Sequence, residues 1–227
     1  MQIIKEWLTF DTAAQVAEAV CADILTQAEQ AIAARGSFKL VLAGGSTPEQ
    51  IYRLLAKAPA NWAKWFIYYG DERCLPVDHP ERNSVMAANA LLDQVPIPAG
   101  QIFTMPTEFG PEQAKTLYQQ AIEHSLPFDM VLLGMGEDGH TASLFPGHQH
   151  LETETVHAVY NSPKPPPERI SLSARALGAT HKLCFIITGA SKQTAVKQWQ
   201  AGEALPVATI APECGVVVYC DASVLGD

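Results

Sequence analysis

Five short apolar runs recur along the chain, and most of them lead into glycine or charged residues. They are FKLVLAG (38–44), WFIYYGDER (65–73), FDMVLLGMG (128–136), HKLCFIITG (181–189) and CGVVVYCD (214–221). Their apolar positions are continuous and do not alternate with polar ones, which is typical of strands buried on both faces of a sheet. We therefore predict five buried strands, the second of which ends in a charged turn at 71–73.

Segments with helical composition lie between these runs. The first, residues 13–35, is rich in Ala, Glu and Gln, with Asp11 or Thr12 available as a cap and Gly36 as a stop. The second follows a glycine pair and carries Pro48 in its first turn. Further helices are predicted at 83–93, 112–124 and 191–200.

The alternation of strands and helices predicts an α/β fold with an open, mainly parallel sheet and helices on both faces. We find no internal repeat, and the Pro-rich stretch 161–169 is short enough to be a rigid loop. The 227 residues are therefore expected to form a single domain, 1–227. Ligands of such sheets bind at the carboxyl ends of the strands, so candidate groups are sought there.

Charge and cysteine content narrow the range of functions. The net charge of −9 disfavours broad binding to nucleic acid or to an anionic membrane. Five scattered cysteines without a C-x-x-C pair indicate reduced thiols in a cytoplasmic protein. No apolar stretch approaches the length of a membrane span, and the first residues do not resemble a signal peptide.

The stretch LAGGSTPEQ (42–50) connects a predicted strand to a predicted helix. Gly44 and Gly45 allow a sharp turn, and Ser46 and Thr47 supply hydroxyl groups. Free N–H groups at the start of a helix bind phosphate well. The alternative is a plain turn capped by Ser or Thr, but the strand–turn–helix context favours a phosphate site.

A second glycine-rich stretch, LLGMGEDGHTASLFPG (132–147), has the spacing G-x-G-x-x-G at Gly134, Gly136 and Gly139. A dinucleotide-binding turn would open a long helix after the third glycine. Pro146 and Gly147 limit any helix here to about two turns. We therefore disfavour a nucleotide site.

The same stretch is better suited to acid–base chemistry. Gly139 permits a tight turn that presents Asp138 and His140 at a strand end, and an imidazole titrates near neutrality, as a general base should. The alternative is a histidine satisfied by nearby backbone. A metal site of Asp138, His140, His148 and His150 is disfavoured because the last two lie beyond the Pro-Gly break and no zinc motif occurs. The serine-hydrolase motif G-x-S-x-G is also absent from the sequence.

Other charged residues also lie near predicted strand ends or in the Pro-rich loop. These candidates are Asp71, Glu72, Arg73, Lys164, Arg169 and Lys192. Solvated lysines and surface ion pairs are the common alternative for such groups.

Taken together, these stretches resemble the 6-phosphogluconolactonase family, which is related to the glucosamine-6-phosphate deaminases and isomerases. The resemblance rests on LAGGSTP, GDERCLPVDHPERN, LLGMGEDGHTASLFPG, SPKPPPERISL and TGASKQ, in family order over nearly the whole chain. Arg82 before Asn83 departs from the small polar residue expected there. The resemblance implies a Rossmann-like fold of the deaminase/ribose-phosphate-isomerase type. It also implies hydrolysis of 6-phospho-D-glucono-1,5-lactone to 6-phosphogluconate in the oxidative pentose phosphate pathway, without metal or organic cofactor.

The resemblance also implies roles for individual residues. His140 corresponds to the family's general base, which Asp138 would orient, and Arg73 would bind substrate or offset charge on the carbonyl oxygen. Asp71 would have a binding or structural role. The implied phosphate site comprises Gly44, Gly45, Ser46, Thr47 and Lys192, with Lys164 and Arg169 as further substrate-binding candidates.

Two other functions stay open at this point, an isomerase or deaminase of an amino-sugar phosphate and a non-catalytic sugar-phosphate binder. The deaminases typically carry a glutamate five positions beyond the histidine, where this chain has Phe145. That difference favours the lactonase. The expected partner is a small sugar-phosphate lactone, bound by a monomer or a small homo-oligomer.

Overall fold

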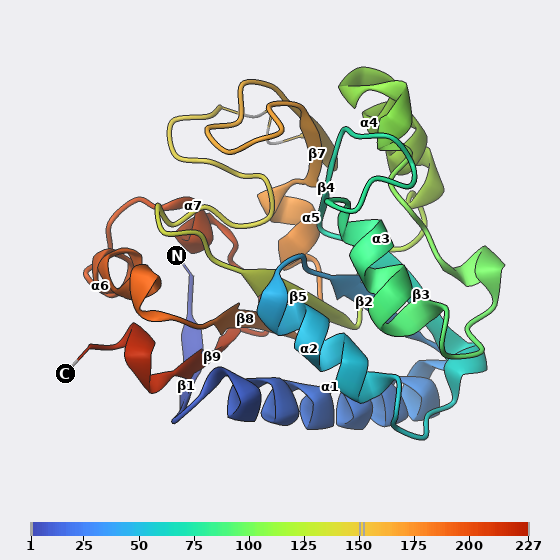
Figure 1. Cartoon of the computed structure of the whole chain (residues 1–227), viewed down its shortest axis with the longest axis horizontal. Coiled ribbons are helices and arrows are strands. Elements are labelled where there is room, and N and C mark those ends of the chain that lie inside the picture. Colours follow the sequence, from blue (N-terminus) through green and yellow to red (C-terminus); the bar gives the residue numbers. More distant parts are fainter. Residues whose placement is uncertain (1, 150, 152, 227) are drawn as a thin grey trace.

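The computed structural model describes residues 2–149, 151 and 153–226 and contains two β-sheets (Figure 1). All pairs in the larger sheet are parallel. Its six strands, in spatial order, are β1 (Ile4–Phe10), β9 (Val216–Asp221), β8 (Leu183–Ile187), β5 (Met130–Gly134), β2 (Phe38–Leu42) and β3 (Trp65–Tyr69). The five predicted strands are therefore confirmed, and an edge strand, β1, is added to them.

The smaller sheet was not predicted. It is antiparallel, in the order β4 (Asp71–Arg73), β7 (Arg169–Leu172) and β6 (Val156–Val159). The charged turn expected at 71–73 is thus wrong, because these residues leave the large sheet at Gly70 and pair with β7. In this pairing Arg73 lies directly opposite Arg169.

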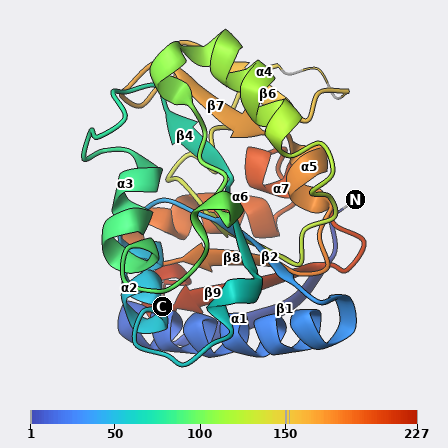
Figure 2. The same ribbon diagram turned by 90° about the vertical axis from the view of Figure 1, so that its right-hand side faces the viewer.

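Helices cover both faces of the large sheet, as predicted (Figure 2). Helices α1 and α2 lie together on one face, and α5 and α7 lie on the other face, below the small sheet and α4 (Figure 2). The helices are α1 (Ala13–Arg35), α2 (Ser46–Leu55), α3 (Asn83–Ala87), α4 (Pro111–Ala121), α5 (Ala174–Gly178), α6 (Gln193–Gln200) and α7 (Pro206–Thr209). Within the described part of the chain, no helix is long and apolar enough to cross a membrane.

Local signals explain the best-predicted helix. Thr12 accepts a hydrogen bond from the backbone N–H of Gln15, and the Gln15 side chain accepts one from the Thr12 N–H. Gly36 ends α1 in the left-handed conformation with φ +81°. Both features satisfy backbone groups that a helix end leaves unpaired.

A buried ion pair supports the loop between β4 and α3. Glu72 is fully buried and accepts hydrogen bonds from the backbone N–H groups of Asn83 and Ser84. Arg82 is also buried, 3.7 Å from Glu72, and donates to Glu108 and to the carbonyl of Met105. The unusual Arg82 therefore links three segments through its guanidinium.

We expect Arg82→Ala to lower the free energy of unfolding by about 3 kcal/mol, because it leaves the Glu72 carboxylate buried without its cation. Urea unfolding measures this change. Arg53→Ala is the matched control, since Arg53 forms only an exposed pair with Glu49 on α2, and such a pair contributes about 0.5 kcal/mol or less. Equal losses in the two variants would contradict the structural role of Arg82.

Candidate functional site

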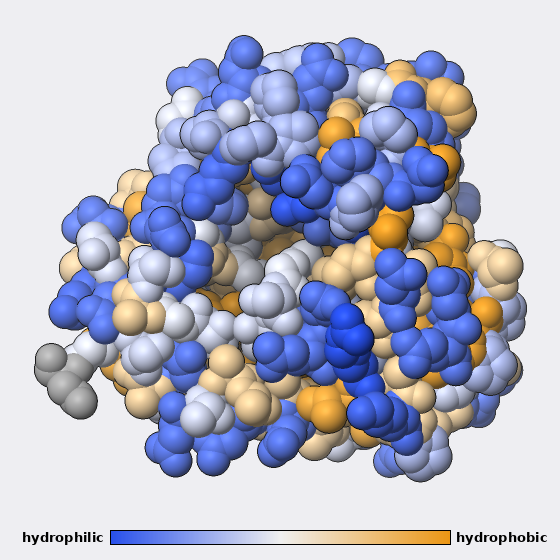
Figure 3. Space-filling view, viewed as in Figure 1, coloured by the Kyte–Doolittle hydropathy of each residue, from blue (hydrophilic) through white to orange (hydrophobic). Residues whose placement is uncertain are grey.

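The carboxyl ends of β2, β3, β5 and β8 surround a cavity of about 270 Å³. Figure 3 shows a hollow near the middle of this face of the molecule, beside the start of α2. The cavity is lined by eight of the residues predicted from the sequence: Gly44, Gly45, Asp71, Arg73, His140, Lys164, Arg169 and Lys192. Segments far apart in the sequence thus meet where the fold class predicts a ligand.

Three predicted site residues, Ser46, Thr47 and Asp138, do not line this cavity. Ser46 is exposed at the start of α2. The hydroxyl of Thr47 lies 2.7 Å from the hydroxyl of Thr188. Within the described chain neither hydroxyl caps α2, whose N-cap is Gly45. The Ser or Thr cap considered as the alternative at this turn is therefore not formed, and Thr47 instead connects α2 to the end of β8. The carboxylate of Asp138 contacts the Nδ1 atom of His140.

The turn from Asp138 to His140 depends on two glycines. Gly139 has φ +77°, a conformation that favours glycine, and the backbone N–H of His140 donates to Asp138 Oδ1. The imidazole lies against Gly136 so closely that a Cβ there would be 2.0 Å from His140 Nδ1. Gly134 differs, because among the described residues no atom beyond its chain neighbours lies within 4 Å of the place that a Cβ on it would occupy.

His140 and Asp138 form a close pair. His140 Nδ1 lies 2.5 Å from Asp138 Oδ1, so an ionised Asp138 holds the proton on Nδ1 and leaves the lone pair on Nε2. Burial lowers the pKa of His140, partly offset by the hydrogen bond and negative charge of Asp138. Burial also acts to raise the pKa of Asp138, but the hydrogen bonds and charge of His140 outweigh it and lower that pKa. Near neutral pH the pair is therefore a neutral imidazole and a carboxylate.

Asp71 is fixed by two residues that the sequence reasoning missed. Ser143 donates to Asp71 Oδ2 at 2.6 Å, and Asn83 Nδ2 lies 3.2 Å from Oδ1. Gly44 is required here, because a Cβ would meet Asn83 Oδ1 at 2.1 Å. For Asn83, the sequence did offer a signal: this residue begins a predicted helix that follows the stretch GDER.

The basic residues differ in how they are held. Arg169 donates to the carbonyls of Lys164, Pro165 and Pro166, so the Pro-rich loop holds its guanidinium. Arg73 donates to the carbonyl of Glu81, while its buried Nε has no hydrogen-bond partner among the described residues. Burial lowers the pKa of Lys192, an effect that the charge of Glu137 opposes. Despite the net negative charge of the chain, the cavity wall therefore concentrates cations.

The metal hypothesis gains no support from the described residues, which contain no group of three His, Cys, Asp or Glu placed to hold an ion. His150 lies outside the residues that the structure describes.

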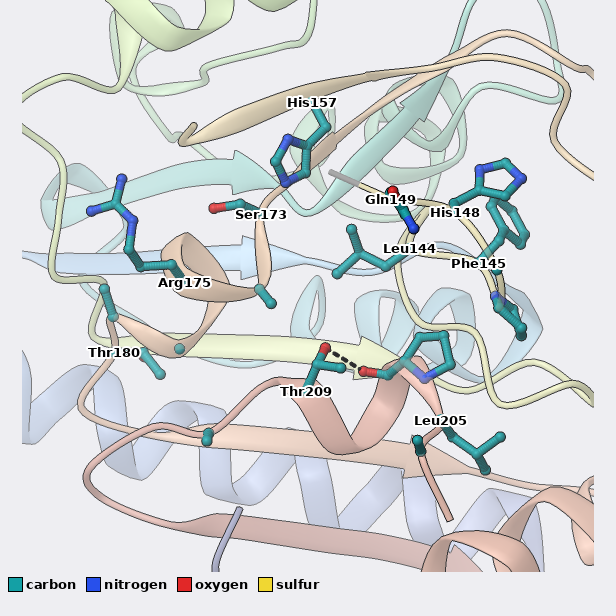
Figure 4. Close-up of a pocket in the computed structure, with 18 of the residues that line it drawn as sticks. Leu144, Phe145, His148, Gln149, His157, Ser173, Arg175, Thr180, Leu205 and Thr209 are labelled. Carbon is teal, nitrogen blue, oxygen red and sulfur yellow. Dashed lines mark hydrogen bonds between the residues drawn. The ribbon is translucent and has the colours of Figure 1, made fainter. Parts of the chain in front are cut away.

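A second and larger cavity, of about 1080 Å³, is bordered by residues 144–149 of the loop that carries His140 (Figure 4). Leu144, Phe145 and His148 line one part of it, and Arg175 and Thr180 line another. His140 lines the smaller cavity and not this larger one, so we take the smaller cavity as the candidate site.

Comparisons with known proteins show the family to which this chain belongs. The family described as glucosamine-6-phosphate isomerases/6-phosphogluconolactonase matches residues 11–219. A 6-phosphogluconolactonase of Streptomyces coelicolor is 40% identical over 207 residues, which cover 82% of this chain and 79% of that protein. The crystal structure of 6-phosphogluconolactonase from Thermotoga maritima has a TM-score of 0.89 and 26% identity, covering 95% of this chain and 99% of that one.

A monomeric glucosamine-6-phosphate deaminase has the same fold, with a TM-score of 0.84 and 18% identity over 96% of this chain and 98% of that one. The predicted fold class is thus confirmed. The fold alone does not separate lactonases from deaminases, so the choice between them depends on side chains.

We expect Asp138→Asn to lower the pKa of His140 further, because the lost negative charge had favoured the protonated imidazole. An NMR titration of the His140 ring protons measures the change. The exposed Asp93→Asn provides a charge-matched control. An unchanged or raised His140 pKa in Asp138→Asn would show that the two side chains do not interact in solution.

Proposed function

Because the chain belongs to the family of glucosamine-6-phosphate isomerases and 6-phosphogluconolactonases, we propose that it hydrolyses 6-phospho-D-glucono-1,5-lactone to 6-phosphogluconate, with His140 as general base. This is the second step of the oxidative pentose phosphate pathway. The observation that carries the proposal is the pair of His140 and Asp138 at a cavity with a cationic wall. We place the enzyme in the cytoplasm, as a monomer or small homo-oligomer, a location that suits its five free cysteines.

A δ-lactone needs only an activated water for hydrolysis. His140 Nε2 takes a proton from water as the oxygen attacks the lactone carbonyl carbon, and Asp138 stabilises the imidazolium that forms. The carbonyl oxygen becomes negatively charged, and we assign to Arg73, which lines the cavity, the role of offsetting that charge. The bond to the ring oxygen then breaks, and His140 returns its proton to that oxygen, which gives the open-chain acid.

The phosphate of the substrate is assigned to the start of α2 and to Lys192. Gly44 and Gly45 line the cavity at the start of α2, where no described side chain caps the helix, and the positive end of the helix dipole favours an anion there. Lys192 follows Gly189 on the neighbouring loop and adds a positive charge. Lys164 and Arg169 are proposed to border the sugar.

Side chains around His140 favour the lactonase over the deaminase. Five positions after His140 the chain has Phe145, whose ring contacts the imidazole with 4.7 Å between centroids. An aromatic ring cannot accept a proton during the opening of an amino sugar. Hydrolysis of a lactone needs one base and one water, so it is not impaired. Asp71, bonded to Ser143, keeps a binding or structural role.

His140→Ala is expected to lower kcat by about a hundredfold or more, the usual contribution of a general base. The variant should fold normally because His140 lies on a loop. A coupled assay in which glucose-6-phosphate dehydrogenase generates the lactone measures turnover, after subtraction of the spontaneous rate. The exposed His124→Ala is the control. Near wild-type turnover in folded His140→Ala would eliminate His140 as the base.

Lys192→Ala is expected to raise KM more than it lowers kcat, because the phosphate is remote from the reacting carbonyl. Unphosphorylated gluconolactone should be a poor substrate of the wild type, because it lacks the phosphate that supplies this binding energy. The exposed Lys57→Ala is the control for loss of a lysine charge. Equal kcat/KM for the two lactones would refute a phosphate anchor.

No ammonia should be released from glucosamine-6-phosphate at enzyme concentrations that hydrolyse the lactone readily. An ammonia assay over the same period, with an active deaminase as positive control, tests this. Enzyme-dependent ammonia release, with lactone hydrolysis no faster than buffer, would reverse the assignment.

A further inference from the structure

The His140 ring is held by groups on more than one side. Nδ1 is bonded to Asp138, the Gly136 backbone lies against the Nδ1–Cε1 edge, and the Phe145 ring contacts the imidazole at an inclination of 38°. The contacts with Asp138 and Gly136 act on one edge of the ring, so small rotations about the Cα–Cβ and Cβ–Cγ bonds can still tilt the imidazole. The contact with Phe145 restricts this motion.

Phe145 also has a second side, which faces the larger cavity. It is 3% exposed and lies beside His148, with 5.6 Å between ring centroids (Figure 4). The guanidinium of Arg169 lies 5.7 Å from the centre of the Phe145 ring. Since His140 lines the smaller cavity and Phe145 the larger one, these two touching rings form part of the wall between them.

We infer that Phe145 is a positioning residue, which fixes the His140 ring on Asp138 and separates the base from the water of the larger cavity. The expected effect on turnover rests on the proposed function. The expected effect on the His140 ring rests only on the geometry of the two rings. A smaller side chain at position 145 opens the wall, so water reaches the imidazole from behind and the ring gains freedom to rotate.

The charges around the two rings decide the direction of the pH effect. Asp138 and Asp71 favour the protonated imidazole, and Lys164 disfavours it. His148, on the same loop, and Arg169, on β7, lie beside the Phe145 ring. All five groups remain when Phe145 is truncated, so the main change is hydration of His140. Hydration favours the charged form, and the pKa of His140 therefore rises towards the ordinary value of histidine, about 6.5.

Phe145→Ala tests the inference, with Leu144→Ala as the matched control. Leu144 is the neighbouring residue, lines the same large cavity and is almost as buried. We expect Phe145→Ala to lower kcat by about tenfold or more, since small displacements of a catalytic group have effects of this size, with KM changed much less. The acid limb of the kcat–pH profile should move to higher pH, because a larger fraction of His140 is protonated at a given pH. Leu144→Ala should show neither change.

Three further measurements complete the test. Thermal unfolding checks that each variant is folded, and Phe145→Leu replaces the alanine variant if that one is unfolded. Phe145→Tyr keeps the ring and should restore both kcat and the acid limb. An NMR titration of His140 reports its pKa without any need for activity.

A Phe145→Ala or Phe145→Leu enzyme with the kcat, acid limb and His140 titration of Leu144→Ala would overturn the inference. A wild type that does not hydrolyse the lactone would refute the proposed function instead, and the titration would still decide whether Phe145 controls the environment of His140.

Discussion

The close approach of the His140 imidazole to the backbone at residue 136 is the contact on which the site depends. Only a residue without a Cβ leaves room for the ring, since a methyl group there would lie 2.0 Å from Nδ1. Gly139 then turns the chain so that Asp138 reaches Nδ1, and Leu205 fills the space behind it. Two of the three glycines that suggested a nucleotide cradle, Gly136 and Gly139, therefore serve packing against side chains.

A second constraint comes from charges buried under the site. The Glu72 carboxylate holds the first N–H groups of α3, and Arg82 neutralises it from the other side. The helix start fixed in this way presents Asn83 to Asp71. Asp71 thus has a defined position although it belongs to a strand of only three residues. The position of the site depends on this buried polar network as much as on the apolar sheet.

The sequence was sufficient to predict elements with continuous apolar runs or clear caps, such as β8 and α1. It did not reveal β1, where apolar and polar residues mix, or the short β6 and β7, which carry His157 and Arg169. Residues on strand-end loops could be predicted to line the site because parallel strands end at one edge of the sheet. The partners of Asp71 and the orientation of Thr47 depend on tertiary contacts with Ser143 and Thr188, far away in the sequence.

The small sheet places two like charges opposite each other, Arg73 on β4 and Arg169 on β7. Directly opposed like charges destabilise an antiparallel pair. The carbonyls of the Pro-rich loop and the Phe145 ring hold Arg169 in place, while Arg73 donates to the carbonyl of Glu81. Burial and the charge of Arg73 lower the pKa of Arg169, whereas the charges of Asp71 and Glu72 raise it. The small sheet therefore carries its own negative charge, which offsets the repulsion and allows both arginines to line the same cavity.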